Sequence, residues 1–438
     1  MPTLVKDPIL NSKAVEAIIS KYSEPNWLAE LRRDAFRKFE SMPWPTNRDE
    51  VWRYSKLKRF SIDGLEASQA KTSNISERIQ MRITDSDAEG IIVHKANQVI
   101  YQQAEISEQG VVFSDLRSAL DSHEELVKKY LFSVINTDTK YSALNAAFWE
   151  NGSFVYVPKN IELSLPLGAF ITADSGGFIA PRTLVVLDSN AKATFIDEYT
   201  SDDFGERLFS SGVVELVMAD GANLRYVNLQ NWSRNVAHIN KMKANLGRSS
   251  RLENLTVNLG ADAARVEVES VLDGSGAESE MLGLYFADKG QHYNSYTLQI
   301  HKQDHGFSDL LFKGALRDAS QAVYSGNIIV DEAAQKTDAY QTNRNFLLDD
   351  SSEVVSIPQL EIKADDVKCS HGSTISPVPE DQRFYLMSRG LRPEVAEHVL
   401  VTSFLHEVTS RVTLPKVAEY VERIVQAKLG VPGVTEKL

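Results

Sequence analysis

Residues 254–301 read NLTVNLGADAARVEVESVLDGSGAESEMLGLYFADKGQHYNSYTLQIH, and apolar and polar side chains alternate along three parts of this stretch. The apolar members of the alternation are Leu255, Val257, Leu259, Val266, Val268, Tyr296, Leu298 and Ile300. A period of two residues is that of a β-strand, in which successive side chains point to opposite faces. We therefore expect strands with one buried and one solvated face. His301 falls at the same alternate positions as the polar residues Thr297 and Gln299, so it should face solvent or a neighbour.

Short clusters rich in Asp, Ala, Gly and Ser separate the strands of the whole β-rich region. They fall at residues 188–193, 220–223, 273–277, 318–321, 331–335 and 349–352. The clusters recur at roughly 15 to 30 residues without long helical patterns between them, which favours a coiled stack of strands over a doubly wound sheet. The predicted fold is mainly β, with a parallel (right-handed) β-helix core. An antiparallel sandwich is the alternative.

Helical patterns flank this core on both sides. Val15, Ile18 and Tyr22 fall on one helical face, and another helix is expected over residues 121–132. Near the end of the chain, Pro415 stands where the first turn of a helix tolerates proline. The predicted segments are a mostly helical one with short strands (1–145), the β-helix core (146–376) and a C-terminal helical one (377–438). The last helices either cap the exposed edge of the stack or form a docking surface, and capping is the simpler prediction.

Charge and cysteine content restrict the classes of partner and compartment. The 438 residues carry a net charge of −13, and a polyanionic surface repels phosphate, so we expect neither nucleic acid nor an anionic membrane as a partner. The single cysteine, Cys369, cannot form a disulfide within the chain, which fits a reducing compartment. No apolar run has the length of a signal peptide or a membrane helix. These observations predict a cytoplasmic protein.

The common enzyme motifs are missing from the sequence. It contains no GxxxxGK[ST], GxSxG, HExxH or paired CxxC, and one cysteine cannot hold a cluster through four thiolates. We therefore do not expect an enzyme with a complete site of its own. The alternative is a β-helix enzyme acting on carbohydrate, with Glu267 and Glu269 as an acid–base pair on one strand face. Alternating Glu residues are more commonly an ordinary solvated strand face.

One late segment, IKADDVKCSHGS (362–373), combines a thiol, an imidazole and carboxylates. In an extended conformation Cys369 and His371 point the same way, and a thiolate beside an imidazole suits iron or iron–sulfur species. Asp365 and Asp366 are candidates to hold a histidine tautomer or to pass iron. The alternative is that the cysteine is a small buried hydrophobe and the histidine a hydrogen-bonded core residue. The other late histidines, which we interpret individually as structural or surface residues, are His292, His301 and His305.

Eight segments spread along the chain carry a family resemblance. They are EVWRYS (50–55), ALNAAF (143–148), GSFVYVP (152–158), FKGALRD (312–318), YSGNIIV (324–330), DAYQTNRNFLL (338–348), PQLEIKADDVKCSHG (358–372) and FYLMSRGL (384–391). Together they resemble the SufB/SufD family of iron–sulfur cluster assembly proteins, and its SufD branch in particular. The resemblance is dense in the C-terminal half and sparse between about residues 190 and 300.

The resemblance implies a non-catalytic scaffold of the SUF system. It implies two partners, a SufB-like paralogous scaffold and a SufC-like ABC-type ATPase, and the ATPase would account for the missing phosphate-binding loop. Residues 377–438 would dock on the ATPase, and the late strands would pair with the paralogue or, without partners, with a second copy. His371 would lie near that interface and take part in forming a nascent cluster, with Cys369 the weaker candidate. No cofactor would be bound permanently, although a transient iron–sulfur cluster would be shared with a partner.

One departure separates this chain from SufB-like proteins. Those proteins carry a cysteine shortly before the stretch that corresponds to SIPQLE (356–361), and Ser352 or a neighbour stands there in this chain. The resemblance therefore implies that the principal cysteine comes from the paralogue.

Overall fold

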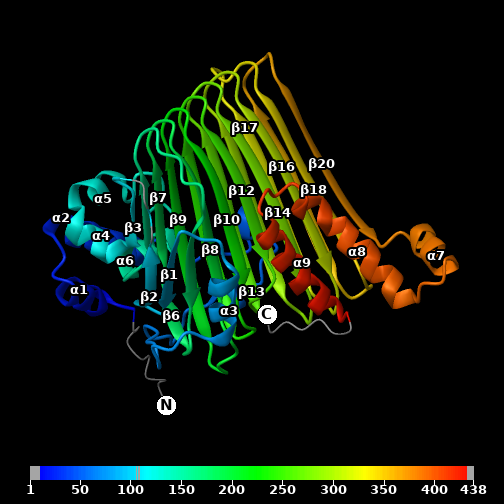
Figure 1. Ribbon diagram of the computed structural model, residues 1–438, viewed down its shortest axis with the longest axis horizontal. Helices are drawn as coiled ribbons and strands as arrows, with labels where there is room; N and C mark the ends of the chain where they lie inside the picture. The colour runs from blue at the N-terminus through cyan, green and yellow to red at the C-terminus, as the bar shows by residue number, and fades with distance from the viewer. Residues whose placement is uncertain (1–9, 105, 107–108, 432–438) are drawn as a thin grey trace.

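The computed structural model describes residues 10–104, 106 and 109–431, and two ten-stranded sheets that face each other form its centre (Figure 1). The first sheet consists, in order, of β2 (Gln98–Ala104), β1 (Gly90–Lys95), β5 (Leu167–Thr172), β8 (Lys192–Thr200), β10 (Asn223–Asn231), β12 (Arg251–Asn258), β14 (Glu278–Ala287), β16 (Phe307–Leu316), β18 (Asp338–Leu347) and β20 (Lys368–Pro377). The second consists of β19 (Glu353–Ile362), β17 (Gln321–Val330), β15 (His292–His301), β13 (Ala263–Leu272), β11 (Val236–Leu246), β9 (Leu208–Met218), β7 (Arg182–Leu187), β4 (Ser153–Val157) and β3 (Val112–Asp115), with β6 (Gly177–Ile179) paired to β9.

From β7 onward, consecutive strands alternate between the two sheets, and each pairs in parallel with the strand two places further along the chain. Glu278 lies beside Phe307, and Phe307 lies beside Asp338, so one coil takes about 30 residues. Only the β1–β2 and β3–β4 pairs are antiparallel among the described strands. The predicted parallel β-helix is therefore confirmed, and the antiparallel sandwich is excluded.

Each corner that leads from the second sheet to the first, from β4–β5 to β17–β18, contains one residue with a positive φ. The stacked residues are Asn160, Asn190, Gly221, Ser249, Gly276, His305 and Lys336. The N–H group of each donates to a carbonyl in the corner of the next coil, as Gly221 does to Arg248 and Lys336 does to Asp366. Glycine and asparagine tolerate this left-handed conformation best, which explains why breaks rich in small polar residues recur along the sequence.

The interior between the sheets contains polar side chains as well as apolar ones. Asn254 of β12 lies in register between Tyr226 and Met281, two members of the central core, and it is buried. The predicted wet faces of β12 and β15 are wrong, because their polar residues point into the coil. His301 is buried there and hydrogen-bonds Ser308 at 2.8 Å, whereas Leu298 lies on the outer, partly exposed side.

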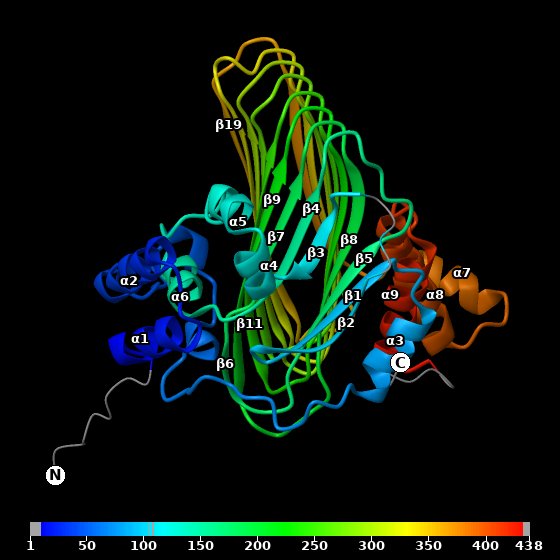
Figure 2. The same cartoon turned by 60° about the vertical axis from the view of Figure 1, so that its left-hand side comes forward.

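The N-terminal helices cover the outer face of the second sheet (Figure 2). They are α1 (Ser12–Lys21), α2 (Asn26–Ser41), α4 (Leu116–Ser122), α5 (Glu124–Tyr130) and α6 (Lys140–Phe148), with short 3-10 turns at Glu50–Trp52 and Leu57–Phe60. The helix predicted over 121–132 is two short helices that meet at His123. One further helix, α3 (Glu77–Asp85), crosses to the first sheet, where Arg82 pairs with Glu198 and lies over the Tyr420 ring.

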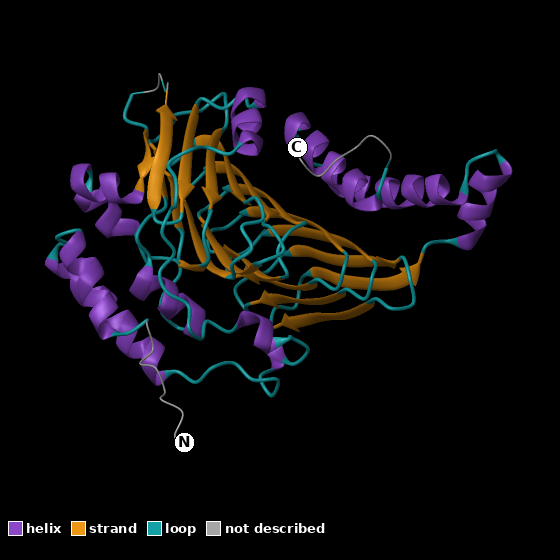
Figure 3. Cartoon of the chain, turned by 90° about the horizontal axis from the view of Figure 1, so that it is seen from below, coloured by secondary structure: helices purple, strands orange, loops and turns teal. Residues whose placement is uncertain are grey.

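The C-terminal helices lie along the opposite side of the coil (Figure 3). They are α7 (Glu380–Ser388), α8 (Pro393–Thr409) and α9 (Pro415–Leu429). Leu405 of α8 and Val421 of α9 are buried against outward-facing residues of the first sheet such as Leu255 and Leu284. The prediction that these helices cap the edge of the stack is wrong, because they cover a sheet face instead. Among the described helices, none has the length and apolar content needed to cross a bilayer.

Candidate functional site

The coil is open at its C-terminal end. Within the described residues, β19 has β17 as its sole hydrogen-bonded neighbour in its sheet, and β20 has β18 (Figure 1). Most residues of β20 are exposed, including Ile375 at 43%. One edge of each strand therefore carries unpaired N–H and C=O groups, which is the arrangement that accepts another strand.

Cys369 and His371 occupy alternate positions of β20 at this open end. They lie in register with Ala339 and Gln341 of β18, whose side chains point into the coil. Cys369 is half-buried beside a small apolar cluster, and burial, followed by the negative charge of Asp338, raises the pKa of its thiol. His371 is exposed, and its side chain forms no hydrogen bond, ion pair or ring contact with another described residue. The two side chains therefore share the inner side of the last coil, where another molecule can reach them.

The structure does not bring the other predicted iron-handling groups to this pair. Asp366 forms an ion pair with Lys336 at the neighbouring corner of the coil. No group of three or more His, Cys, Asp or Glu side chains suited to a metal ion occurs among residues 10–104, 106 and 109–431. At β20 this chain thus presents one thiol and one imidazole, which is fewer donors than an iron–sulfur cluster needs.

The remaining late histidines lie apart from one another. The ring of His292 accepts a hydrogen bond from the backbone N–H of Lys56 at 3.0 Å, and burial, aided by the charges of Lys56 and Arg59, lowers its pKa to about 3. His301 lies inside the coil, and burial lowers its pKa to about 4. His305 is exposed at a corner, 3.0 Å from Asp304. His292 and His301 are structural residues and His305 is a surface residue, which agrees with the prediction that each is an ordinary structural or surface histidine.

Glu267 and Glu269 do not form an acid–base pair for carbohydrate. Glu267 lies 2.7 Å from Arg265, and Glu269 lies 3.1 Å from Lys241 and 3.4 Å from Lys243. Although burial raises the pKa of Glu267, Arg265 and Lys241 lower it further, so the carboxyl group stays ionised. A general acid requires the opposite shift. The carbohydrate-active alternative is therefore not favoured.

A second exposed surface lies on α7 and the first half of α8. Its large apolar side chains are Phe384, Tyr385, Met387 and Val399, with exposed fractions of 71%, 56%, 39% and 42%. Beside them is a hollow of about 350 Å³ lined by Asp381, Gln382, Tyr385, Leu386, Val399 and Leu400. Exposed aromatic side chains at this density are typical of a protein-binding surface.

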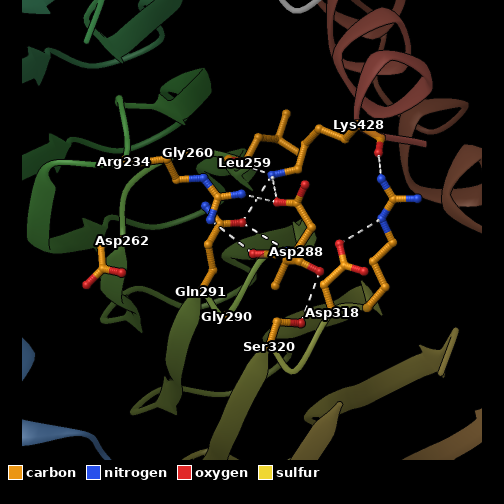
Figure 4. A network of polar contacts seen from close by, with 12 residues as sticks. Arg234, Leu259, Gly260, Asp262, Asp288, Gly290, Gln291, Asp318, Ser320 and Lys428 are labelled. Carbon is orange, nitrogen blue, oxygen red and sulfur yellow. Dashed lines mark hydrogen bonds and ion pairs between the residues drawn. The ribbon is translucent and has the colours of Figure 1, made fainter. Parts of the chain in front are cut away.

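Helix α9 is fastened to the coil by a buried ionic contact (Figure 4). The Lys428 ammonium lies 2.9 Å from Asp288 Oδ1, and it donates to the Leu259 carbonyl at 2.6 Å and to Gln291 Oε1 at 3.1 Å. The Lys428 and Asp288 side chains are 5% and 1% exposed. Arg234 also pairs with Asp288, and the Arg317 guanidinium donates to the Lys428 carbonyl. This contact holds α9 in place, whereas α7 projects beyond β20 (Figure 1).

Comparison with known proteins gives consistent matches along the chain. Residues 12–168 match the SufBD protein N-terminal region, and residues 170–404 match the SUF system FeS cluster assembly, SufBD core domain. An iron–sulfur cluster assembly SufBD family protein of Staphylococcus aureus (strain MRSA252) is 30% identical over 432 residues, which cover 94% of this chain and 91% of that protein. Another, of Staphylococcus haemolyticus (strain JCSC1435), is 29% identical with the same coverage. The chain has the predicted β-helix, and it matches both the N-terminal region and the core domain of the family. It therefore belongs to the SufBD family of iron–sulfur cluster assembly proteins.

Proposed function

We propose that the chain is a non-catalytic, SufD-type scaffold of the SUF assembly machine, which works with a SufB-like paralogue and a SufC-like ATPase. The observation that carries the proposal is the open end of the coil, where two unpaired strand edges adjoin Cys369 and His371. A site that is both incomplete and exposed is suited to completion by a partner.

The unpaired edges of β19 and β20 support pairing with the paralogue. A strand of another β-helix can satisfy their free backbone groups and continue both sheets across the interface. In the absence of the paralogue, a second copy of this chain offers the same edges, so a homodimer is the expected alternative state.

The donor set supports a cluster that is shared between the two scaffolds. The resemblance places Ser352 or a neighbour where SufB-like proteins carry a cysteine. Ser352 is buried, and its hydroxyl donates to Asp349 at 3.0 Å. In this proposal Ser352 is not a ligand of iron, whereas His371 and, more weakly, Cys369 serve iron as a transient cargo, and the paralogue supplies the principal cysteine. Iron accepts both thiolate and imidazole donors.

The exposed surface on α7 and α8 is the proposed docking site of the ATPase. Phe384 and Tyr385 provide aromatic anchors, which contribute a large share of binding energy at protein interfaces. The sequence carries no phosphate-binding loop, so nucleotide hydrolysis falls to the partner. Because β20 runs into α7 through residues 377–380, movement of the docked helix would act directly on the strand that bears the site.

The test is co-expression of the tagged chain with its SufB-like and SufC-like neighbours, followed by native mass measurement. The wild type should purify with both partners. Phe384→Ser should lose the ATPase alone, and Ile375→Lys should lose the paralogue, whereas Leu165→Ser, a matched control at a position 46% exposed, should lose neither.

His371→Ala separates assembly from cluster formation. This variant should retain both partners and lose cluster formation, measured as iron and acid-labile sulfide per complex. A wild-type chain that purifies without either partner would overturn the assembly proposal. Undiminished cluster formation by His371→Ala would overturn the assignment of the site.

A further inference from the structure

Gln341 crosses the interior of the coil just inside the open end. It belongs to β18, is 1% exposed, and its Nε2 donates to the Gly326 carbonyl of β17 in the opposite sheet at 3.3 Å. Gly326 leaves the room for this contact, because a Cβ there would lie 2.7 Å from Gln341 Nε2 and 2.4 Å from the Tyr324 hydroxyl. The amide nitrogen is therefore directed to the second sheet.

The other end of the same amide has no partner. Gln341 Oε1 is buried and accepts no hydrogen bond from any residue of the described chain. Gln299 Oε1 and His238 Nε2 are also unpartnered, but they belong to earlier coils, where water is the group that can reach them. Gln341 lies one strand from the open end, so a protein side chain can supply the missing donor.

His371 is the side chain placed to do so. It is in register with Gln341 on the neighbouring strand, and side chains opposed in this way on one sheet face have Cβ atoms about 5 Å apart. The His371 side chain is exposed and forms no hydrogen bond, ion pair or ring contact with another described residue, so its ring is free to turn toward the amide. A neutral imidazole carries one N–H donor and one lone pair, and the partner of the donor decides which nitrogen keeps the lone pair.

We propose that Gln341 is a positioning residue for His371. Its Oε1 accepts the Nδ1–H of the imidazole, which leaves the Nε2 lone pair directed to the mouth of the coil for iron. Metal-binding histidines characteristically donate their second nitrogen to an oxygen acceptor in this way. The inference rests on the proposed role of His371 in handling iron, although the hydrogen bond itself exists without metal.

The direct test is the tautomer of His371 in the metal-free chain, measured by ¹⁵N NMR at pH 8 and assigned with His371→Asn. The Nδ1–H form should dominate in the wild type, whereas a solvated histidine side chain favours the Nε2–H form. Gln341→Leu should convert His371 to the Nε2–H form, and Gln341→Glu, which keeps an acceptor, should preserve Nδ1–H. Asn258→Leu is the matched control, since it removes a buried amide with an unpartnered oxygen from β12, an earlier coil, and should leave His371 unchanged.

Cobalt(II) binding separates this inference from the proposed function. Gln341→Leu should weaken Co(II) affinity about 10-fold, and His371→Ala should abolish specific binding. Equal tautomer ratios in the wild type and Gln341→Leu would overturn the positioning role. If the tautomer changes as expected but His371→Ala binds Co(II) like the wild type, the hydrogen bond stands and the iron-handling role fails.

Discussion

The Lys428–Asp288 contact yields a quantitative prediction for the attachment of α9. Lys428→Met keeps most of the side-chain length but removes the ammonium that lies 2.9 Å from Asp288 and serves two further acceptors. Breaking a buried pair by removal of one partner costs about 3–5 kcal/mol. Arg234 remains beside Asp288, with 39% of its side chain exposed, and offsets part of the lost attraction. We therefore expect the free energy that holds α9 on the coil to fall by about 2–3 kcal/mol.

Hydrogen exchange of the α9 amides measures this free energy locally. A loss of 2–3 kcal/mol corresponds to exchange that is about 25- to 150-fold faster, because 1.4 kcal/mol is a factor of ten. Amides of β13 and β15, in the middle of the coil, should change far less. Lys416→Met is the matched control on the same helix, since Lys416 and Asp87 are 53% and 63% exposed and such pairs contribute at most about 1 kcal/mol.

Two results would refute the reasoning. The first is equal acceleration of α9 exchange in Lys428→Met and Lys416→Met, which would mean that burial adds nothing to the contact. The second comes from the double-mutant cycle with Asp288→Asn. If the two changes add within about 0.5 kcal/mol, Lys428 and Asp288 do not interact as the structure indicates.

Four further predictions follow from other buried or constrained positions. Lys336→Gly should be about 1 kcal/mol more stable to urea than Lys336→Ala, because both lose the exposed ion pair but only glycine relieves the positive φ of 62°. Burial lowers the pKa of His238 to about 3, below the unfolded value of 6.5, so this residue makes the free energy of unfolding fall as pH falls below 6.5. His238→Gln should therefore flatten the plot of that free energy against pH between pH 5 and 6, by about 1.4 kcal/mol per pH unit. Burial raises the pKa of Asp197 to about 7, which has the opposite sign and costs stability as pH rises from about 4 to 7, so Asp197→Asn should steepen the same profile. Glu215→Gln should destabilise the chain by about 3–5 kcal/mol in urea unfolding, because it strands the buried guanidinium of Arg182; an effect below 1 kcal/mol would contradict the pairing.

Local patterns predicted most of the architecture. The alternation in β12, β13 and β15 and the recurring polar breaks indicated a coil of strands, since a period of two and a left-handed corner are both local properties. Pro415 stands at the start of α9 as predicted, and Pro393 has the same place in α8, because proline fits a first turn. Cys369 and His371 occupy alternate positions of a strand, which their spacing also indicated.

The errors arose where distant parts of the chain meet. The alternation of apolar and polar residues identifies the two faces of a strand, but it does not tell which face points into the coil. In β12 the apolar face is the outer one, which helices far away in the sequence bury, and Asn254 points inward. The proximity of Gln341 to His371 was missed for a similar reason. They are neighbours because one coil takes about 30 residues, and a pattern confined to 362–373 contains no such distance.

The regular coil also sets fixed distances along the length of the protein. Every complete coil adds one strand to each sheet and moves the open end about 4.8 Å along the stack, while the corners and the pairing register of all earlier coils stay as they are. Along the stack, the α9 anchor at Asp288, directly after β14, and the mouth at His371 of β20 are three strand spacings apart. Inserting or deleting a complete coil between these two points changes their separation by one strand spacing. A partner that contacts both points therefore constrains the number of coils between them, whereas the amino-acid sequence of those coils can vary.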